Sequence, residues 1–557
     1  MENTNAQYTL FDYVDELNCK DKPISVYDEI NIDIDSKPDA EWKIKFNGYN
    51  LQSYISDIET FGIEKTWDNI CRYSLTSEHI NNFLSVSKFG ELYEIALAVQ
   101  DKQHKKDNGQ YYTPEDVANV MSGWLNSLSP KVVCDVACGT GKLILTYLDL
   151  IGAEDANKLL DDGNLYLYDL DKIALTICKT AILIIYGKQY NKKIHAIHCD
   201  FLDKNIHLPK HCKVISNPPY AGISSIPNNW NKTQVQVETK ELYSCFMEKI
   251  ISESESSVII TPYSFLGGKK FYSLRHFMNA HSGFIVSFDN VPGNIFCGRK
   301  QGIFNTNTAN SVRASITVVK NNDEKGFVIS PLIRFKNEER KLLLNCDLLE
   351  STLPNKYQIV DKKNSMYAKC HKELQEVFDK WLETANDNTI KKLLVSTKSK
   401  YNIYMPNTCR YFTTASSYEL KRTGMITLSF NDKFAFEFTY CLINSSFAYW
   451  WWRIFDGGIT YPVGLLYNLP NIIETLSDSD RKFFEEICSE MIALEKDCIV
   501  TKMNAGTLQE NIKFPERYRN DINNRLLNIL GISVESPDIF NVVHKNSFFG
   551  GVSDSDV

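Results

Sequence analysis

The sequence lacks any apolar run long enough to cross a membrane. The run from Ala181 to Tyr186 is far too short, because a transmembrane helix needs about 20 consecutive apolar residues. The first residues, Met1 to Asn5, also lack the basic and apolar regions of a secretory signal. We therefore expect a cytoplasmic protein with no membrane partner.

Motifs for metal binding are missing as well. The chain has 15 cysteines, but none belongs to a Cys-x-x-Cys motif or to a Cys/His pair with the spacing of zinc ligands. Cys178, Cys245 and Cys441 lie inside apolar runs, where cysteine acts as a small hydrophobic residue. The sequence predicts reduced thiols and no metal site.

Basic residues are not in excess. The net charge of −8 argues mildly against a nucleic-acid binder, although a local basic patch matters more than the total charge. The composition, with 43% hydrophobic and 23% charged residues among 557, is that of a globular protein. We expect about two to four domains, because single cores rarely exceed ~250–300 residues.

Common nucleotide-binding and nuclease motifs are absent from the first part of the chain. The turn from Asp135 to Gly141 reads Asp-x-Ala-x-Gly-x-Gly, which differs from the dinucleotide fingerprint, and Lys142 is followed by Leu143 instead of the Ser or Thr of a P-loop. Residues 1–105 are predicted to be mainly helical. The acidic letters between Asp33 and Lys43 favour a solvated turn over an endonuclease site.

What the chain does contain is an unusual corner, Asn217-Pro218-Pro219-Tyr220, directly after the run Lys213 to Ser216. That run predicts a short buried strand. Two consecutive prolines remove two backbone donors and fix two φ angles, so the corner holds an amide, rigid carbonyl groups and an aromatic ring at the strand end. Such a corner suits the binding of a planar amino group, although a plain Pro-Pro loop would have the same letters.

Three preceding strands also end in glycines or acids. Val132 to Val136 leads to Gly139 and Gly141, Leu165 to Tyr168 leads to Asp169, and Ile194 to His198 leads to Asp200-Phe201. Glycine lets the backbone approach a ligand, and an acid at the next strand end commonly binds ribose hydroxyls. An Asp beside an aromatic ring suits adenine, because the carboxylate can bind the exocyclic amine and the ring can stack on the base. Because parallel strands direct their carboxyl ends to one edge, we expect all four strand ends to converge there.

A capped helix start precedes these strands. The segment Gly109-Gln110-Tyr111-Tyr112-Thr113-Pro114 offers an N-cap residue and a proline at the first helical position. The helix that follows would be stable for this reason alone. We predict in addition that the turn's backbone and Thr113 approach a ligand.

Taken together, these motifs resemble those of the γ-type DNA adenine-N6 methyltransferases, which include type I modification subunits and stand-alone type II enzymes. The resemblance covers about residues 85–320 and extends to Glu241-Leu242-Tyr243 with Phe246 and to Val258 to Pro262. It implies an α/β fold with a Rossmann-like class I methyltransferase sheet, an N-terminal helical region and a C-terminal α+β target-recognition domain. The predicted units are 1–105, 106–335, 336–475 and a helical region at 476–557.

The resemblance also implies S-adenosylmethionine as the cofactor and assigns roles to the matched residues. The catalytic residues would be Asn217, Pro218, Pro219 and Tyr220. Tyr111 to Pro114 would close over the methionine end of the cofactor, the two turn glycines would line its methionine portion, Asp169 would bind its ribose and Asp200 its adenine. The predicted cofactor-binding set is Tyr111, Tyr112, Thr113, Pro114, Asp135, Ala137, Gly139, Thr140, Gly141, Asp169, Asp200, Phe201 and Asn217.

The implied reaction is methyl transfer to N6 of an adenine flipped out of double-stranded DNA. The Asn217 side-chain oxygen and the Pro218 carbonyl would accept the N6 hydrogens, and Tyr220 would stack on the base, so positioning and electrostatics would replace a tuned base. Because Asn-Pro-Pro-Tyr also serves enzymes that act on protein glutamine or guanine N2, a methyltransferase for protein glutamine or RNA stays open. The large C-terminal part opposes it. A catalytically idle DNA-binding subunit is the third possibility, and the intact chemical residues oppose that.

Beyond residue 335 the pattern changes to basic residues mixed with aromatic and hydroxyl side chains. Such mixtures suit contacts with phosphates and base edges, and a solvated basic face explains any single cluster equally well. The predicted DNA-binding residues are Lys398, Lys400, Arg410, Lys421 and Arg422.

An aromatic stretch, Phe447 to Trp452, follows Asn444-Ser445-Ser446. It loosely resembles a helix of type II target-recognition regions, and we predict that its rings form a core and not a stacking platform. Residues 475–531 are predicted to be helical and to pack on the enzyme or on a partner. The resemblance implies that the protein acts in a restriction–modification system, with a specificity subunit or a cognate endonuclease as partner, or that it acts alone as an orphan methylase.

Overall fold

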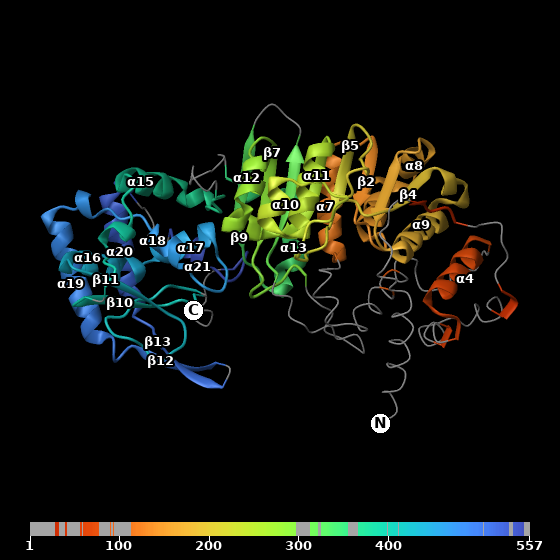
Figure 1. Cartoon of the computed structure of the whole chain (residues 1–557). Helices are drawn as coiled ribbons and strands as arrows, with labels where there is room; N and C mark the ends of the chain where they lie inside the picture. Colours follow the sequence, from red (N-terminus) through yellow and green to blue (C-terminus); the bar gives the residue numbers. More distant parts are fainter. Residues whose placement is uncertain are drawn as a thin grey trace, which may run out of the picture.

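The computed structural model describes residues 28–32, 39–41, 56–57, 60–76, 90, 93, 113–296, 312–320, 325–354, 366–397, 399–409, 411–504, 506–533 and 539–550. Within these residues the chain forms a large sheet with helices on both faces and, beside it, a second body of helices with two small sheets (Figure 1). No helix of the described part combines the length and apolar character needed to cross a membrane.

Nine strands of the described part form one sheet in the order β1-β4-β3-β2-β5-β6-β8-β7-β9. They are β1 (Asp28–Glu29), β2 (Val132–Val136), β3 (Leu165–Asp169), β4 (Ile194–His198), β5 (Cys212–Ser216), β6 (Ser256–Pro262), β7 (Ser282–Phe288), β8 (Ala314–Lys320) and β9 (Gly326–Ile333). The strands β2 to β6 are parallel neighbours, while β8 is antiparallel to both β6 and β7. The predicted Rossmann-like methyltransferase sheet is confirmed, and its order reverses beside β2, where open α/β sheets bind ligands.

Helices cover both faces of this sheet because its strands are apolar on both sides. One hydrophobic cluster joins the sheet to α7 (Glu115–Ser127), α8 (Lys142–Asp161) and α9 (Lys172–Tyr186). A second cluster, on the opposite face, joins it to α11 (Leu242–Glu253) and α12 (Tyr272–Met278). The short α10 (Gln234–Thr239) contacts α11 and α12.

The N-terminal part was predicted to be helical, and the structure shows a strand there as well as α4 (Ile63–Thr76). β1 pairs with the edge strand β4, which otherwise would expose unpaired backbone groups. The buried Lys179 donates to the carbonyls of Ile30 (2.6 Å) and Ile194 (3.0 Å), so one lysine of α9 fastens both strands.

The sheet unit extends past the predicted boundary at residue 335. The helices α13 (Arg340–Leu343) and α14 (Cys346–Ser351) follow β9, and Trp124 of α7 donates from Nε1 to Glu350 at 2.7 Å. Residues up to 351 therefore pack with the sheet.

The C-terminal body has one continuous core that runs from Ala368 to Val543. Its elements are α15 (Gln375–Ala385), β10 (Tyr401–Pro406), β11 (Met425–Phe430), α16 (Lys433–Ile443), α17 (Ser446–Phe455), α18 (Val463–Tyr467), α19 (Asp478–Leu494), β12 (Ile499–Asn504), β13 (Thr507–Ile512), α20 (Glu516–Ile529) and α21 (Asn541–His544). Phe438 of α16 packs edge-on against Phe484 of α19, with ring centroids 5.1 Å apart. The predicted division at residue 475 therefore cuts through one core, and the region predicted as helical also contains the β12–β13 hairpin.

The aromatic stretch of α17 forms the centre of that core, as predicted. Trp450 is fully buried, Trp452 is 1% exposed and Trp451 is 5% exposed. Ser445 caps the helix by accepting from the Phe447 amide, and Ser446 lies 2.9 Å from Nε2 of His544. The Asn-Ser-Ser segment thus starts a helix and fastens the C-terminal segment to it.

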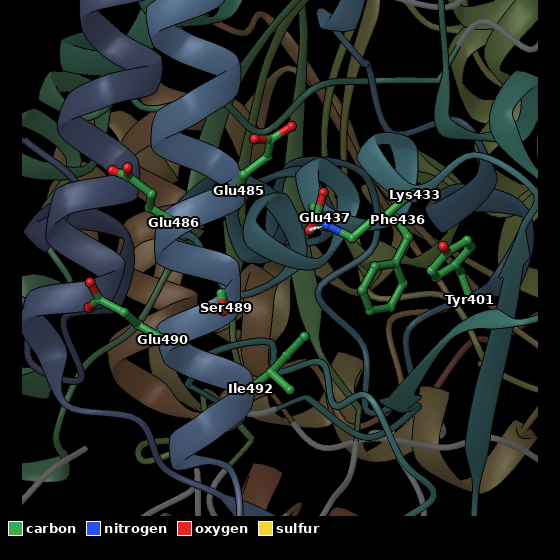
Figure 2. A pocket seen from close by; sticks show the side chains of 9 residues that line it. All are labelled: Tyr401, Lys433, Phe436, Glu437, Glu485, Glu486, Ser489, Glu490 and Ile492. Atoms are coloured by element: carbon green, nitrogen blue, oxygen red, sulfur yellow. Dashed lines mark hydrogen bonds and ion pairs between the residues drawn. The ribbon is translucent and has the colours of Figure 1, made fainter.

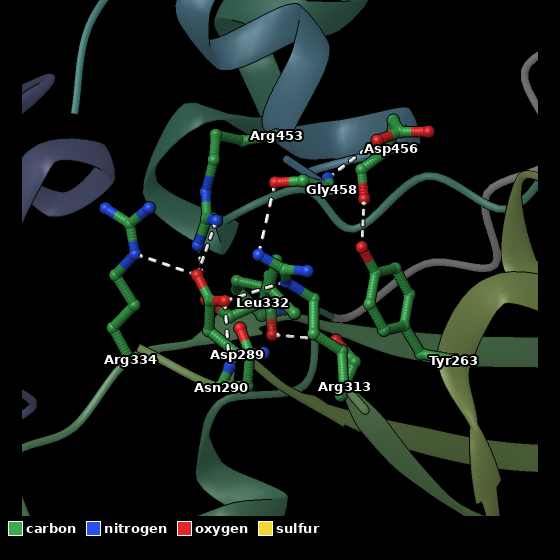
Figure 3. Close-up of polar contacts among 11 residues, drawn as sticks. Tyr263, Asp289, Asn290, Arg313, Leu332, Arg334, Arg453, Asp456 and Gly458 are labelled. Carbon is green, nitrogen blue, oxygen red and sulfur yellow. Dashed lines mark hydrogen bonds and ion pairs between the residues drawn. The ribbon is translucent and has the colours of Figure 1, made fainter. Parts of the chain in front are cut away.

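A buried cluster of charges joins the two bodies (Figure 3). We name it the arginine cluster: Asp289, directly after β7, accepts from Arg313 (2.9 Å), Arg334 (2.9 Å) and Arg453 of α17 (2.7 Å). The Tyr263 hydroxyl donates to the carbonyl of Asp456 at 2.8 Å beside it. Asp289 is only 2% exposed, and its three arginine partners hold its pKa well below its usual value despite burial. The arginine cluster is therefore a buried, ion-paired contact between the two bodies.

Candidate active site

The corner Asn217-Pro218-Pro219-Tyr220 lies directly after β5, at the centre of the sheet. The Ser216 hydroxyl donates to the carbonyl of Val136 at 2.6 Å, so the ends of β5 and β2 are tied together. Asn217 is consequently held beside the turn that follows β2.

Two hydrogen bonds orient the Asn217 side chain. Its Nδ2 donates to Oγ1 of Thr113 at 2.9 Å, and the Tyr220 hydroxyl lies 2.7 Å from its Oδ1. The same hydroxyl lies 3.1 Å from the Ile260 carbonyl. The amide nitrogen therefore faces Thr113 and the amide oxygen faces Tyr220. An amide oxygen can accept two hydrogen bonds, which is compatible with the predicted role.

The turn after β2 is shaped by glycines. Gly139 has a φ of 53° and Gly141 a φ of 92°, a region that residues with a Cβ seldom adopt. A Cβ at Gly141 would also lie 2.5 Å from the Cys178 sulfur. The turn thus presents bare backbone at the strand end.

Asp169 connects this turn to β3. Its Oδ2 accepts from the Gly139 amide at 2.7 Å, and its Oδ1 accepts from the Asp171 amide at 2.8 Å. Burial and the nearby Asp171 carboxylate raise the pKa of Asp169 to about 6. Asp171 in turn caps α9 and accepts from the Tyr93 hydroxyl at 2.8 Å, so the N-terminal region reaches this strand end.

Asp135, within β2, is fully buried, and neither of its carboxylate oxygens has a hydrogen-bond partner in the described part of the chain. Burial and the Asp169 carboxylate raise the pKa of Asp135 well above its usual value. A buried polar group of this kind is usually satisfied by a further partner.

Asp200 and Phe201 follow β4 as predicted, but their partners differ from the prediction. Asp200 accepts from Trp230 Nε1 at 2.6 Å and from the Leu202 amide at 3.0 Å. The Phe201 ring packs against Tyr168 and Phe246 and is 3% exposed. Little of this ring is therefore accessible to an adenine, which argues against the predicted stacking.

Comparison with known proteins gives this region a family. Residues 85–301 match the family model described as N-6 DNA Methylase. The central region of the chain is thus similar to that family. S-adenosylmethionine is the cofactor of that family, as the sequence predicts.

The methylase region has curated relatives of low identity. The type I restriction enzyme MpnII methylase subunit of Mycoplasma pneumoniae is 22% identical over 346 residues, which cover 57% of this chain and 58% of that protein. The type I restriction enzyme EcoEI methylase subunit of Escherichia coli is 25% identical over 192 residues, which cover 32% of this chain and 38% of that protein. The chain thus spans little more than half the length of the first relative and less of the second.

Solved structures are similar to the chain only loosely. The type I restriction enzyme EcoKI M protein gives a TM-score of 0.30 at 16% identity and covers 60% of this chain and 66% of its own. A DrdV–DNA complex gives 0.41 at 15% identity and covers 64% and 40%. These scores are too low to add to the family assignment.

We call the carboxyl ends of β2, β3, β4 and β5 the methylase edge. This edge fits S-adenosylmethionine on the features described above. Gly139 and Gly141 give the turn after β2 its positive φ angles, and carboxyl groups with unused acceptor capacity stand at the ends of β3 and β4. The unpartnered Asp135 lies in the strand beneath the turn. Thr140 is nearly buried, and a Cβ at Gly90 would lie 2.6 Å from its hydroxyl oxygen, so a residue of the N-terminal region covers the turn. The predicted contacts of Tyr111 and Tyr112 lie outside the described residues.

The described members of the predicted DNA-binding set differ in exposure. Lys400 and Lys421 are exposed, whereas Arg422 is half-buried and donates to Asn511 of β13 and to Thr408 at 2.6 Å. Lys398 and Arg410 lie outside the described residues. Arg422 therefore serves the hairpin, and the DNA contacts of the other residues stay predictions.

A groove of about 620 Å³ lies in the C-terminal body between α16 and α19, and Figure 2 shows the side chains that line it. Its lining includes four glutamates, Glu437, Glu485, Glu486 and Glu490, and a single lysine, Lys433. Four carboxylates would repel a phosphate backbone, so the groove is unsuited to DNA. In the described part of the chain, no group of three or more His, Cys, Asp or Glu side chains could hold a metal ion.

Several residues at the methylase edge escaped the sequence analysis. Trp230, Tyr93 and Asp116 contribute contacts there, and Arg340 lies beyond the matched family region. No motif marks them. Their partners lie far away in the sequence, for example 224 residues between Arg340 and Asp116.

Proposed function

We propose that this protein transfers a methyl group from S-adenosylmethionine to N6 of an adenine in double-stranded DNA. The observation that carries the proposal is the Asn217 side chain, which Thr113 and Tyr220 hold at the end of β5 beside the glycine turn of β2. The family match of residues 85–301 supports the same chemistry.

The difficulty of the reaction lies in the nucleophile. The lone pair of adenine N6 is delocalised into the ring, and S-adenosylmethionine supplies an electrophilic methyl group when bound. Asn217 Oδ1 and the Pro218 carbonyl oxygen would each accept one N6 hydrogen, which localises electron density on the nitrogen and aims it. Such catalysis depends on positioning and on preorganised dipoles, so it needs no residue that titrates near neutral pH.

Tyr220 has two possible tasks in this site. Its ring lies edge-on to Tyr243 (6.2 Å between centroids) and to Phe296 (6.1 Å), and its hydroxyl supports Asn217. We infer that it orients the amide and, with these rings, forms the apolar wall against which the base lies.

The target base must leave the duplex to reach this corner, because N6 is inaccessible inside a stacked duplex. Flipping the base out costs a few kcal/mol. The C-terminal body, fixed to the catalytic edge by the arginine cluster, would hold the flanking DNA. Curated relatives are named as methylase subunits of type I restriction enzymes, so we propose a role in restriction and modification, with a specificity subunit or an endonuclease as partner.

A three-substrate experiment tests the proposal. The purified chain is incubated with labelled S-adenosylmethionine and, separately, with duplex DNA of diverse sequence, with RNA and with protein. We expect label in DNA, recovered after digestion as N6-methyladenine. Label in protein glutamine or in RNA would favour the alternative methyltransferase, and cofactor binding without transfer would favour an idle subunit. All three incubations need repeating with candidate partner subunits.

A further inference from the structure

Arg340, the first residue of α13, joins two segments that flank the proposed catalytic corner. Its guanidinium donates to both carboxylate oxygens of Asp116, with Nη2 at 2.8 Å from Oδ1. It also donates to the carbonyl oxygens of Asn294 (2.6 Å) and Ile295 (2.7 Å). The arginine side chain is 14% exposed, so these charge-assisted bonds are largely shielded from water.

The first of these segments leads to Asn217. Asp116 lies in the first turn of α7, three residues after Thr113, whose hydroxyl oxygen accepts from Asn217 Nδ2. The bidentate contact between Arg340 and Asp116 therefore fixes the end of α7 that carries Thr113. A shift of this helix end would move the acceptor that orients the amide.

The second segment leads to Tyr220. Asn294 and Ile295 precede Phe296, whose ring lies edge-on to the ring of Tyr220. Ile295 and Phe296 are buried at 1% and 5% exposure. Arg340 holds this segment through two carbonyl oxygens, so the same side chain supports the wall behind Tyr220.

The residue before Arg340 anchors this short helix to the end of the chain. Glu339 accepts from the Ser547 hydroxyl and from the amides of Phe548 (2.9 Å) and Phe549 (3.0 Å). These bonds lower the pKa of Glu339 to about 2 in spite of partial burial. Because the carboxylate is ionised at any working pH, the C-terminal segment keeps α13 in place on the methylase unit.

We propose that Arg340 is a positioning residue for methyl transfer, which sets the relative placement of Asn217 and Tyr220 by bracing α7 against the 294–296 segment. The inference rests on the proposed function of Asn217. A planar guanidinium has donors on both sides and can serve the carboxylate and both carbonyls together, whereas the ammonium of a lysine cannot reproduce that fork. We therefore expect Arg340→Lys to be nearly as impaired as Arg340→Ala.

The test compares Arg340→Ala and Arg340→Lys with a matched control, Lys341→Gln, at the exposed neighbouring position. We expect kcat of both arginine variants to fall roughly 10- to 100-fold, with KM for DNA and the Kd for S-adenosylmethionine within about twofold of the parent, since the lost interaction acts on the reacting geometry. The control should keep the parental kcat. An unchanged kcat, or a loss confined to thermal stability, would overturn the assignment.

Chemical rescue separates positioning from mere stability. Millimolar guanidinium chloride should restore part of the lost kcat of Arg340→Ala, and sodium chloride at the same ionic strength should not. Equal effects of the two salts would count against the inference. The double variant Asp116→Asn with Arg340→Ala should be no slower than the worse single variant, because the two residues act as one unit. Additive losses would mean that they act separately.

Failure of the proposed function is distinguishable from failure of this inference. If the parent transfers no methyl group to DNA, the proposed function falls, and crystal structures of the parent and of Arg340→Ala decide the inference. We expect the contact between Thr113 and Asn217, 2.9 Å here, to be kept in the parent and broken in the variant. An intact contact in the variant would overturn it.

Discussion

The methylase unit and the C-terminal body use their polar residues in opposite ways. In the methylase unit, polar groups stand at the carboxyl ends of neighbouring strands and converge on one edge, where Asn217, Thr113 and Tyr220 form a connected set. In the C-terminal body, polar groups such as Ser445, Ser446 and Arg422 cap helices or join elements. The first arrangement places polar groups where they can contact a ligand. In the second arrangement, the polar groups stabilise the elements that surround an aromatic core.

The difference teaches where motif reasoning holds. A strand end in a parallel sheet places a residue at the ligand-binding edge whatever the rest of the chain does. A basic residue in a loop has no such constraint, because its role depends on whichever surface folds beside it. Five predictions put this comparison to the test, beginning with the largest expected effect.

Substitution of the catalytic amide should separate chemistry from binding. We expect Asn217→Ala to lower the rate of methyl transfer by on the order of 10²–10³-fold or more, because it removes a preorganised acceptor from the reacting nitrogen. S-adenosylmethionine should bind with a Kd within about twofold of the parent, as measured by calorimetry. Asn205→Ala, in a turn after β4, serves as a control that should leave the rate unchanged. Near-normal turnover of the Asn217 variant would show that the chemistry lies elsewhere.

Removal of the anion from the arginine cluster should separate the two bodies energetically. Asp289→Asn leaves Arg313, Arg334 and Arg453 without their shared carboxylate, and loss of one partner from a buried ionic group typically costs about 3–5 kcal/mol. We expect the C-terminal body to unfold at a lower urea concentration, as monitored by intrinsic tryptophan fluorescence. Cofactor binding should survive at low denaturant. The exposed Asp347→Asn in α14 is the control, and equal stabilities of the two variants would mean that the cluster contributes nothing.

The same cluster gives a direction for acid sensitivity. The three arginines keep the pKa of Asp289 well below its usual value, so the folded state binds this proton less tightly than the unfolded chain does. The stabilisation is complete above the ordinary carboxyl pKa of about 4 and is lost as the pH falls below it. The Asp289→Asn variant should lack this component of the acid transition.

The sheet and its strand-end residues were predictable because apolar runs indicated the strands and recognisable motifs followed directly after them. Gly139, Asp169 and Asn217 each follow a short apolar run, and the sheet order brings those runs side by side. Arg340 and Trp230 were not predictable, since neither belongs to a motif and their partners are brought near only by the complete fold. The position of Phe201 after β4 was predicted correctly, but its burial in the core was not. A sequence does not show whether a ring at a strand end packs into the core or faces a ligand.

In the C-terminal body, composition predicted the aromatic core but not the number of units. The helical reading of residues after 475 missed the β12–β13 hairpin, and no sequence signal showed that Phe438 and Phe484 would meet. A core built from residues far apart in the chain leaves no local pattern. Arg422 illustrates the same limit, since its partner Asn511 lies in that hairpin.

The strand-end carboxylate should make cofactor binding depend on pH. Burial and the Asp171 carboxylate raise the pKa of Asp169 to about 6, so the folded apoprotein holds this proton more tightly than the unfolded chain and loses some stability as the pH rises from about 4 to 6. A ribose hydroxyl donates best to the ionised form. We therefore expect the affinity for S-adenosylmethionine to rise with pH through about 6, by at most roughly tenfold per pH unit.

Calorimetry between about pH 5 and pH 8 measures this dependence. The neighbouring Asp135 has a raised pKa of its own, so Asp169→Asn is the variant that isolates the contribution of Asp169. It should bind the cofactor more weakly, with an affinity that no longer changes across that range. A parent whose affinity is flat with pH would mean that Asp169 does not meet the ribose.

Two neighbouring residues of the C-terminal body give the smallest and most discriminating test. Lys421 is exposed, and its backbone amide, not its ammonium group, bonds Glu510, whereas the guanidinium of Arg422 is engaged by Asn511 and Thr408. If Lys421 meets a phosphate, Lys421→Ala should weaken DNA binding by roughly a few-fold and lower the salt-dependence slope by about one, uniformly across sequences. Arg422→Ala should instead lower the thermal stability of the body with no change in that slope, because the Arg422 guanidinium is hydrogen-bonded within the fold. The exposed Lys482→Ala on α19, beside the acidic groove, is the matched control and should change neither quantity. A slope change in the Arg422 variant and none in the Lys421 variant would reverse the assignment, and would mean that a half-buried guanidinium is released from the hairpin when DNA binds.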